Sequence, residues 1–352
     1  MRPTLQTVAD AVGVSRSTVS NAYSRPDQLS PELRRRILDA AQRVGYAGPD
    51  PTARSLRRGR AGAIGVLVTA SLPYAFTDPY AVQFLRGLAE SVQGRDTGLL
   101  LIPQSLDDER AAVRAVNNAA VDGFCIFCMP DWHPSLAAIQ ARGLPVVSDQ
   151  RRSADELFVG IDEAGATRTA GRHLARLGHR RVAVIGDHLL AGPTRPVTVT
   201  SPDDVTYYGN RERMRGYYDA FREAGIDWAD VIAISTDVNS KETGTAAAAY
   251  VLDRPDPPTA VVAFSDVLAL GVLDALAARG LRPGHDVSVI GFDDIGESER
   301  AGLTTISQPA AERGRLSGQL LLDPPKDHTG RQIVLPTELI IRDSTRPVTT
   351  KE

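Results

Sequence analysis

Three polar side chains near the N-terminus, Arg16, Ser17 and Asn21, have the types and spacing that contact with base pairs requires. Helical periodicity places them on one exposed face, with Val19 and Ala22 on the buried one. Arginine can donate two hydrogen bonds to guanine, and asparagine can form two with adenine. The segment therefore predicts a helix that reads sequence in the major groove of DNA.

Hydroxyl side chains around this helix suit the phosphate oxygens of DNA, which helix N-termini also attract. Those that we include as candidate DNA contacts are Thr4, Ser15, Thr18 and Ser20. Thr4 and Ser15 also stand where two helices would need a capping oxygen. No single hydroxyl distinguishes a cap from a DNA contact, so the prediction depends on the whole set.

These side chains need a scaffold of short helices. The apolar spacing over residues 5–12 predicts a first helix, which Gly13 ends because glycine tolerates the left-handed conformation of a tight turn. A second helix starts after Ser15, and the pair forms a helix-turn-helix. A third helix is predicted over residues 31–44. We therefore expect a three-helix DNA-binding head over residues 1–48.

Charge is distributed unevenly along the chain. Residues 1–60 carry eleven arginines, no lysine and five acidic residues, whereas residues 61–352 carry 29 basic and 38 acidic residues. A basic head on an acidic body is expected when a nucleic-acid-binding domain is joined to a domain that does not bind nucleic acid. No apolar run reaches the length of a membrane span, and the N-terminus lacks the apolar core of a signal peptide. We therefore expect a cytoplasmic protein that makes no membrane contact.

From residue 61 onward, apolar β-branched runs alternate with amphipathic segments of helical period. Runs such as 64–68, 123–127 and 181–185 have the composition of strands buried on both faces. Their alternation with helices predicts an α/β fold with doubly wound parallel sheets. The eight runs are more than one sheet usually holds, which is about 5–6 strands, so we expect two lobes.

Polar residues follow several predicted strands, where ligands of open α/β sheets bind. Asp149, Ser265, Asp266 and Asp293 stand at such positions, and Arg213 lies early in a predicted helix. Carboxylates and a guanidinium that converge on one cleft can bond several hydroxyls, which suits a sugar or a similar polar metabolite. Asp266 could instead cap the helix that follows it.

The two cysteines, Cys125 and Cys128, have the CxxC spacing of some metal and redox sites. No second pair and no paired histidines accompany them, and their neighbours are apolar, so a buried strand explains them better. We expect no metal and no other cofactor. Nucleophile-elbow, phosphate-loop and zinc-protease motifs are also absent from the sequence, and we expect no enzyme.

The chain closely resembles the LacI/GalR family of bacterial transcription regulators. In the head, the resemblance rests on the runs VADAVGVSRSTVS, LSPELRRRILDAA and the closing GY. In the body, it rests on LARLGHRRVA, FSDVLALG, VIGFDD and LPTELIIRDST. The sequence departs from the family at residues 72–80 and 188–209, where this chain is longer.

The resemblance implies a hinge over residues 49–60 that becomes helical on operator DNA. Within it, Ala53, Arg54, Leu56 and Arg57 match DNA-binding or partner-facing positions, with Leu56 as a wedge in the minor groove. The resemblance also implies a homodimer on a palindromic operator, acting as a repressor.

The resemblance further implies that residues 61–352 form a two-lobed, periplasmic-binding-protein-like domain for effector binding and dimerisation. We expect the N-lobe over about 61–161 and 294–323, and the C-lobe over about 162–293 and 324–352.

Within that domain, Asp149, Arg213, Ser265 and Asp293 match effector-contacting positions of the family. Asn239 stands where some relatives have an aromatic wall. Stacking on the effector could come instead from aromatic residues elsewhere, or these could be packing residues; they are Tyr74, Phe76, Tyr80 and Phe264.

Overall fold

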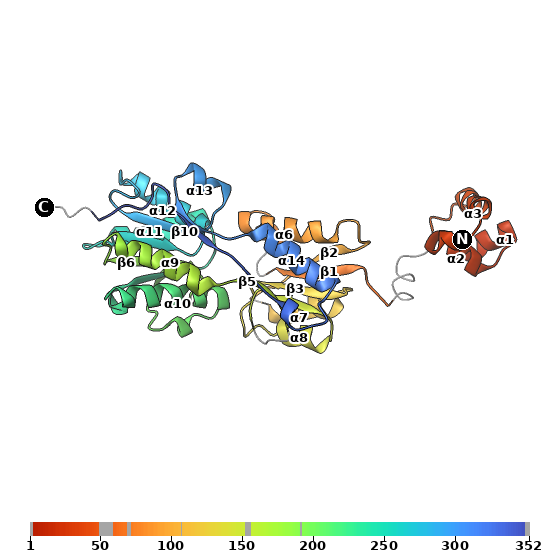
Figure 1. Ribbon diagram of the computed structural model, residues 1–352, viewed down its shortest axis with the longest axis horizontal. Coiled ribbons are helices and arrows are strands. Elements are labelled where there is room, and N and C mark those ends of the chain that lie inside the picture. The colour runs from red at the N-terminus through yellow and green to blue at the C-terminus, as the bar shows by residue number, and fades with distance from the viewer. Residues whose placement is uncertain are drawn as a thin grey trace. The chain divides into compact units, whose positions relative to one another are not determined.

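The computed structural model describes residues 3–48, 59–68, 72–106, 108–151, 156–190 and 192–348. The chain forms two compact units, Met1–Gly62 and Ala63–Glu352 (Figure 1). In the described residues, no helix has the length and hydropathy needed to cross a lipid bilayer.

The first unit is a bundle of three helices around one small core. Its elements are α1 (Leu5–Val12), α2 (Arg16–Ser24), the 3-10 turn η1 (Pro26–Gln28) and α3 (Pro31–Arg43). Gly13, with a φ of 77°, ends α1 as the sequence predicts. Buried residues from all three helices pack together, namely Val8, Ala9, Val19, Ala22, Ile37, Ala40 and Ala41. The predicted helix-turn-helix head is confirmed.

The second unit contains two sheets with helices on both faces, which we call the N-lobe and the C-lobe (Figure 1). The N-lobe sheet has the order β12-β5-β4-β3-β1-β2, and its neighbouring strands are parallel. Its strands are β1 (Ala63–Val68), β2 (Gly98–Pro103), β3 (Gly123–Phe127), β4 (Val146–Ser148), β5 (Leu157–Ile161) and β12 (Gln332–Leu335). Its helices are α5 (Leu72–Ala75), α6 (Pro79–Val92), α7 (Glu109–Asn118), α8 (Ser135–Ala141), α14 (Ala310–Leu322) and η4 (Thr329–Arg331).

The C-lobe sheet has the order β13-β11-β10-β9-β6-β8-β7, with antiparallel pairing only at its two edges. Its strands are β6 (Val182–Asp187), β7 (Arg195–Val197), β8 (Ile232–Thr236), β9 (Ala260–Ala263), β10 (Ser288–Asp293), β11 (Thr304–Ser307) and β13 (Glu338–Ile340). Its helices are α9 (Glu163–Arg176), η2 (Pro202–Asp204), α10 (Tyr208–Glu223), η3 (Trp228–Asp230), α11 (Lys241–Leu252), α12 (Asp266–Ala278) and α13 (Gly296–Arg300). The predicted two-lobed α/β body is confirmed.

The lobe boundaries differ from those that we expected. β11 pairs in parallel with β10, so residues up to 307 belong to the C-lobe and not to the N-lobe. β12 pairs with β5, so the chain stays in the N-lobe until residue 335, beyond the expected 323. Because β11 and β12 each have only four residues, hydrogen bonding to neighbouring strands decides their lobe.

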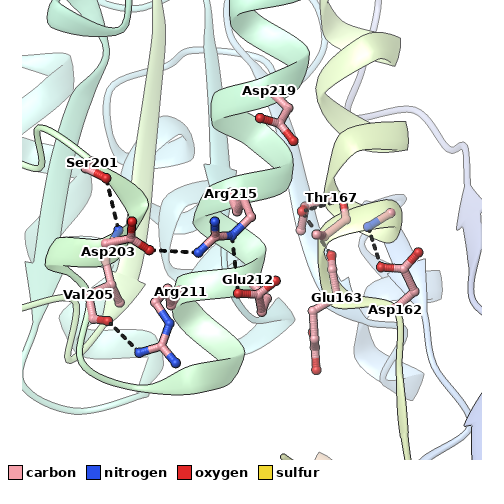
Figure 2. Close-up of polar contacts among 12 residues, drawn as sticks. Asp162, Glu163, Thr167, Ser201, Asp203, Val205, Arg211, Glu212, Arg215 and Asp219 are labelled. Carbon is pink, nitrogen blue, oxygen red and sulfur yellow. Dashed lines mark hydrogen bonds and ion pairs between the residues drawn. The ribbon is translucent and has the colours of Figure 1, made fainter. Parts of the chain in front are cut away.

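The segment 188–209, where the sequence departs from the family, is built into the C-lobe wall. Its strand β7 extends the sheet beside β8, and the loop after β7 is held against α10 (Figure 2). Arg215 of α10 bonds the Asp203 carboxylate at 2.8 Å, and Arg211 donates to the Val205 carbonyl at 3.4 Å. The insertion is therefore a fixed part of the wall beside the start of α10.

Candidate functional site

The exposed face of α2 is the candidate nucleic-acid interface of the first unit. Arg16 and Ser17 are exposed, and Ser20 and Asn21 are half-buried on the same side, opposite the buried Val19. The three side chains predicted for base contact therefore lie on one accessible helical face, which they share with Ser20, a predicted phosphate contact.

Two of the other hydroxyls predicted for the head serve as local caps, and the third contacts one of them. Thr4 caps α1 by accepting from the Thr7 amide at 3.3 Å, and Ser15 caps α2 by accepting from the Thr18 amide at 3.0 Å. The Thr18 hydroxyl lies 2.8 Å from that of Ser15. Thr4 and Ser15 are exposed and Thr18 is half-buried, so each hydroxyl could contact a phosphate in addition to these bonds. The predicted hinge residues lie outside the described part of the chain, namely Ala53, Arg54, Leu56 and Arg57.

The second unit holds a cavity of about 220 Å³ whose lining comes from both lobes. Much of it is built where parallel strands end. Cys128 follows β3 and Asp149 follows β4 in the N-lobe, while Asp187 ends β6, Ser265 follows β9 and Asp293 ends β10 in the C-lobe. This is the position at which open α/β sheets bind ligands.

Eight of the ten predicted effector residues line the cavity, namely Tyr74, Tyr80, Asp149, Arg213, Asn239, Phe264, Ser265 and Asp293. Phe76 does not, because it follows the single turn of α5 that directs Tyr74 inward, and its own side chain is 64% exposed.

Asp266 does not line the cavity either, and it does not cap α12. Ser265 is the cap, accepting from the Leu268 amide at 3.1 Å. The Asp266 carboxylate is fully buried and accepts from the Ile295 amide, the Ser298 hydroxyl and the Thr305 hydroxyl at 3.0, 2.6 and 2.5 Å. Burial raises its pKa to about 6. Asp266 therefore ties α13 and β11 to α12 and has a structural role.

Arg213 is held by several groups at the C-lobe side of the cavity. Its Nε donates to Glu163 Oε2 at 2.8 Å, and its Nη1 donates to the Phe264 carbonyl. Its guanidinium lies 3.7 Å from the ring centroid of Phe292. Burial raises the pKa of Asp293 well above its usual range, and the Arg213 charge opposes that rise. Asp293 has a φ of 115° and accepts from Gln308 Nε2 at 2.6 Å.

Arg313 is a cavity residue that the sequence did not indicate. It lies on α14, distant in sequence from the other lining residues, and its side chain is only 5% exposed. It donates to Tyr80 Oη at 2.8 Å and to the Val159 carbonyl at 3.1 Å, and it lies 4.0 Å from Asp149 Oδ2. The buried Arg313 guanidinium thus holds the N-lobe side of the cavity together. On that side, Asp149 also accepts from the Cys128 amide at 2.8 Å.

Further lining residues escaped the sequence analysis. They are Val66, Val68, Ala75, Asp78, Ala81, Leu85, Phe127, Cys128, Gln150, Glu163, Asp187, His188, Tyr207, Tyr208, Gly209, Asn210, Asp237 and Val238. Asp187 and Asp237 carried a usable signal, since each ends or follows a strand. His188 and Tyr207 come from the insertion, and their rings stack with centroids 5.5 Å apart.

The cysteines make no pair in the structure. Cys125 is buried in β3, as predicted. The prediction was wrong for Cys128, which follows the strand, is exposed and lines the cavity. Burial raises the pKa of the Cys125 thiol. Within the described ranges, no cluster of three or more His, Cys, Asp or Glu residues is arranged to hold a metal ion.

In the described part of the chain, two polar contacts cross from one lobe to the other beside the cavity. Asn239 Nδ2 donates to Tyr74 Oη at 3.0 Å, and Arg211 Nη2 lies 2.9 Å from Asp131 Oδ2. Tyr74 in turn donates to Asp78 Oδ2 at 3.1 Å. Tyr74 lies within residues 72–80 and Arg211 stands two residues after 188–209, the two segments that the sequence analysis singled out. These contacts favour the lobe arrangement that encloses the cavity.

We expect Arg211→Glu and Asp131→Arg each to shift the lobes toward a more open arrangement, because each places like charges face to face. The double variant restores an ion pair with reversed polarity, so it should recover the closed lobe arrangement. An ion pair at a part-exposed site contributes roughly 0.2–1 kcal/mol, which sets the size of the expected shift. Single-molecule fluorescence energy transfer between labels on the two lobes measures the distance between the lobes in each variant. The same reversal at Arg172 and Glu223, which pair within the C-lobe at 2.7 Å, is the control and should leave the lobe distance unchanged. Failure of the double variant to recover closure contradicts the assignment.

Comparison with known proteins agrees with both units. The family model described as bacterial regulatory proteins, lacI family, matches residues 4–48, and that of a periplasmic binding protein-like domain matches residues 172–345. The chain is 41% identical to an HTH-type transcriptional regulator of Mycolicibacterium smegmatis, with 96% of this chain and 95% of that protein covered.

Solved structures give the same result. A LacI-family transcriptional regulator from Corynebacterium glutamicum is 36% identical, covers 99% of this chain and 100% of its own, and superposes with a TM-score of 0.73. The transcriptional regulator CelR in complex with cellobiose is 28% identical to this chain and superposes with a TM-score of 0.67. The match covers 97% of this chain and 100% of the CelR chain. The relative and the two structures match nearly the whole length of the chain, and the two family models match the head and most of the second half. The chain therefore belongs to the LacI family of bacterial transcription regulators, with a helix-turn-helix domain and an effector-binding domain.

Proposed function

We propose that the chain is a sequence-specific repressor that binds a palindromic operator as a homodimer, and that a small sugar-like effector bound between its lobes sets its operator affinity. The observation that carries this proposal is a cavity lined by hydroxyl-bonding groups at strand ends of both lobes, on a chain whose head presents a polar α2 face.

Operator reading is assigned to α2. Arg16, Ser17 and Asn21 would contact base edges in the major groove, while Thr4, Ser15, Thr18 and Ser20 would contact phosphates. Two heads related by two-fold symmetry would read the two halves of a palindrome.

The hinge would couple the head to the sensor. A helix of about eight residues is too short to be stable alone, so its order can depend on DNA and on the spacing of its attachment points. Paired hinge helices would then insert Leu56 into the central minor groove and bend the DNA.

The effector would act through its different affinities for two arrangements of the lobes. Ligand binding can shift an equilibrium only by that difference. Because the lining comes from both lobes, an effector that contacts Asp149 on one side and Asp293 on the other binds one lobe arrangement better than another. Carboxylates that accept from several hydroxyls suit a sugar, and a relative of the same fold has been solved with cellobiose.

The test has two stages with the full-length protein. Selection from a randomised duplex library should enrich a palindrome that binds about 10³-fold or more tightly than random duplex at physiological salt. A thermal-shift screen over sugars, polyols and nucleosides should then find a stabilising compound that changes affinity for that palindrome. Uniform binding to all duplexes would indicate an architectural DNA binder, and steady turnover of a bound sugar would indicate an enzyme.

A further inference from the structure

The cavity contains more acidic groups than basic ones. Among the described residues that line it, the carboxylates are Asp78, Asp149, Glu163, Asp187, Asp237 and Asp293, and the guanidinium groups are Arg213 and Arg313. No described lysine lines it. The sign of this imbalance bears on which ligands can enter.

Both guanidinium groups already face carboxylates of the protein. Arg213 bonds Glu163 at 2.8 Å and also lies near Asp293, and Arg313 lies 4.0 Å from Asp149. Each also donates to carbonyl or hydroxyl oxygens, so neither is an uncommitted cation in the cavity.

The remaining carboxylates have only uncharged partners within the described residues. Asp78 accepts from Tyr74 and from the Tyr80 amide, and Asp237 accepts from the Thr194 hydroxyl at 2.8 Å. The Asp187 carboxylate has neither a hydrogen bond nor an ion pair within the described part of the chain.

These acidic groups act on one another. Burial raises the pKa of Asp78, and the Asp187 carboxylate raises it further. Burial likewise raises the pKa of Asp293, and Asp266 and Asp78 add to the rise. An additional negative charge would meet the same repulsion.

In the described part of the chain, three helices that begin at the cavity, α6, α12 and α10, offer no free N-terminus to an anion. The end of α6 is capped by Asp78, whose Oδ1 accepts from the Tyr80 amide at 3.1 Å, and the end of α12 is capped by Ser265. The end of α10 lacks a side-chain cap, but a Cβ built on Gly209 would lie 4.0 Å from a Glu163 carboxylate oxygen. A carboxylate of the protein therefore lies close to the first turn of α10, and an anion bound there would meet its repulsion.

We infer that the cavity admits ligands that carry several hydroxyl or amino hydrogens and no anionic group, and that Asp187 is the main residue that rejects anions. Asp187 would accept from a ligand hydroxyl and would repel a phosphate or carboxylate. This inference rests on the proposed sensor function. It restricts the effector to unphosphorylated polyols, sugars, nucleosides or their amino derivatives.

The first test separates effectors by charge. A metabolite extract of the source bacterium is passed through anion-exchange resin, and the unretained and retained fractions are added to the full-length protein. We expect only the unretained fraction to raise the melting temperature and change operator binding. Action by the retained fraction overturns the charge inference. If neither fraction acts, the sensor function itself fails and the inference falls with it.

The second test uses defined pairs: glucose with glucose 6-phosphate, ribose with ribose 5-phosphate, and adenosine with its 5′-monophosphate. The parent of a binding pair should bind about 100-fold or more tightly than its ester, given the Coulomb repulsion in a part-buried site. Tighter binding of any ester than of its parent overturns the inference.

The third test assigns the discrimination to one residue. Asp187→Asn keeps the side-chain shape and removes the charge, so the preference for parent over ester should narrow about tenfold. Asp230→Asn, at an exposed position away from the cavity, is the control and should leave the preference unchanged. An unchanged preference in Asp187→Asn removes that residue from the proposed role.

Discussion

Replacing Arg16 and Asn21 of α2 together with alanine should lower affinity for the selected operator by about 30-fold to 10⁴-fold, since each base contact contributes about 1–3 kcal/mol of discrimination. Affinity for random duplex should fall only a few-fold, because just one phosphate-attracting charge is removed. Fluorescence anisotropy with operator and scrambled duplexes at one salt concentration measures both.

The head should stay folded in this variant, because neither side chain belongs to the core around Val8, Val19 and Ile37. Arg36→Ala on α3 is the matched control. Arg36 is exposed, and replacing it removes one positive charge from a different face of the head. The affinity for both duplexes should therefore fall by the same factor. Equal losses in the α2 variant as well would remove α2 from base recognition.

The second large effect is expected at Asp293, where Asn should lower effector affinity by about 10²-fold while operator binding survives. The substitution removes a carboxyl oxygen that can accept a ligand hydroxyl beside Arg213 in the cavity, and a buried polar group left without its partner costs about 1–3 kcal/mol. Asn is preferred to Ala as the first test because the residue has a φ of 115°, a region that Asn tolerates better than most residues. Titration calorimetry with the compound found in the thermal-shift screen gives the affinity.

Asp294→Asn provides a control at the next position. Asp294 also has a positive φ, of 56°, but it bonds Arg342 at 2.7 Å and does not line the cavity. The Asp294→Asn variant should therefore bind the effector with unchanged affinity. If Asp293→Asn also keeps it, Asp293 belongs to the structural support of β10 and not to the effector site.

Three of the predicted cavity residues share one local property: each lies at the carboxyl end of a strand or just after it. Asp149, Ser265 and Asp293 were identified in this way, because the carboxyl ends of parallel strands meet at one edge. The same rule was wrong for Asp266. It stands one residue beyond Ser265, and at a helix start that step turns the side chain away from the cleft and into the core.

Arg313, Glu163 and Tyr207 could not be predicted by any local rule. Arg313 reaches the cavity only because α14 returns to the N-lobe after the chain has built most of the C-lobe. Glu163 is a helix-start residue like many others, and only the approach of α10 to α9 gives it Arg213 as a partner. The Tyr207 ring faces the cavity because the insertion is fixed to α10.

The sequence by itself determined the three-helix head, the two-lobed α/β body and the family, because caps, glycine turns and buried strand runs are set by neighbouring residues. Only the tertiary structure decided the lobe of each four-residue strand, the contacts that cross between lobes and the acidic character of the cavity. Those features depend on side chains that lie far apart in sequence, and their charges act on one another only at the distances that folding creates.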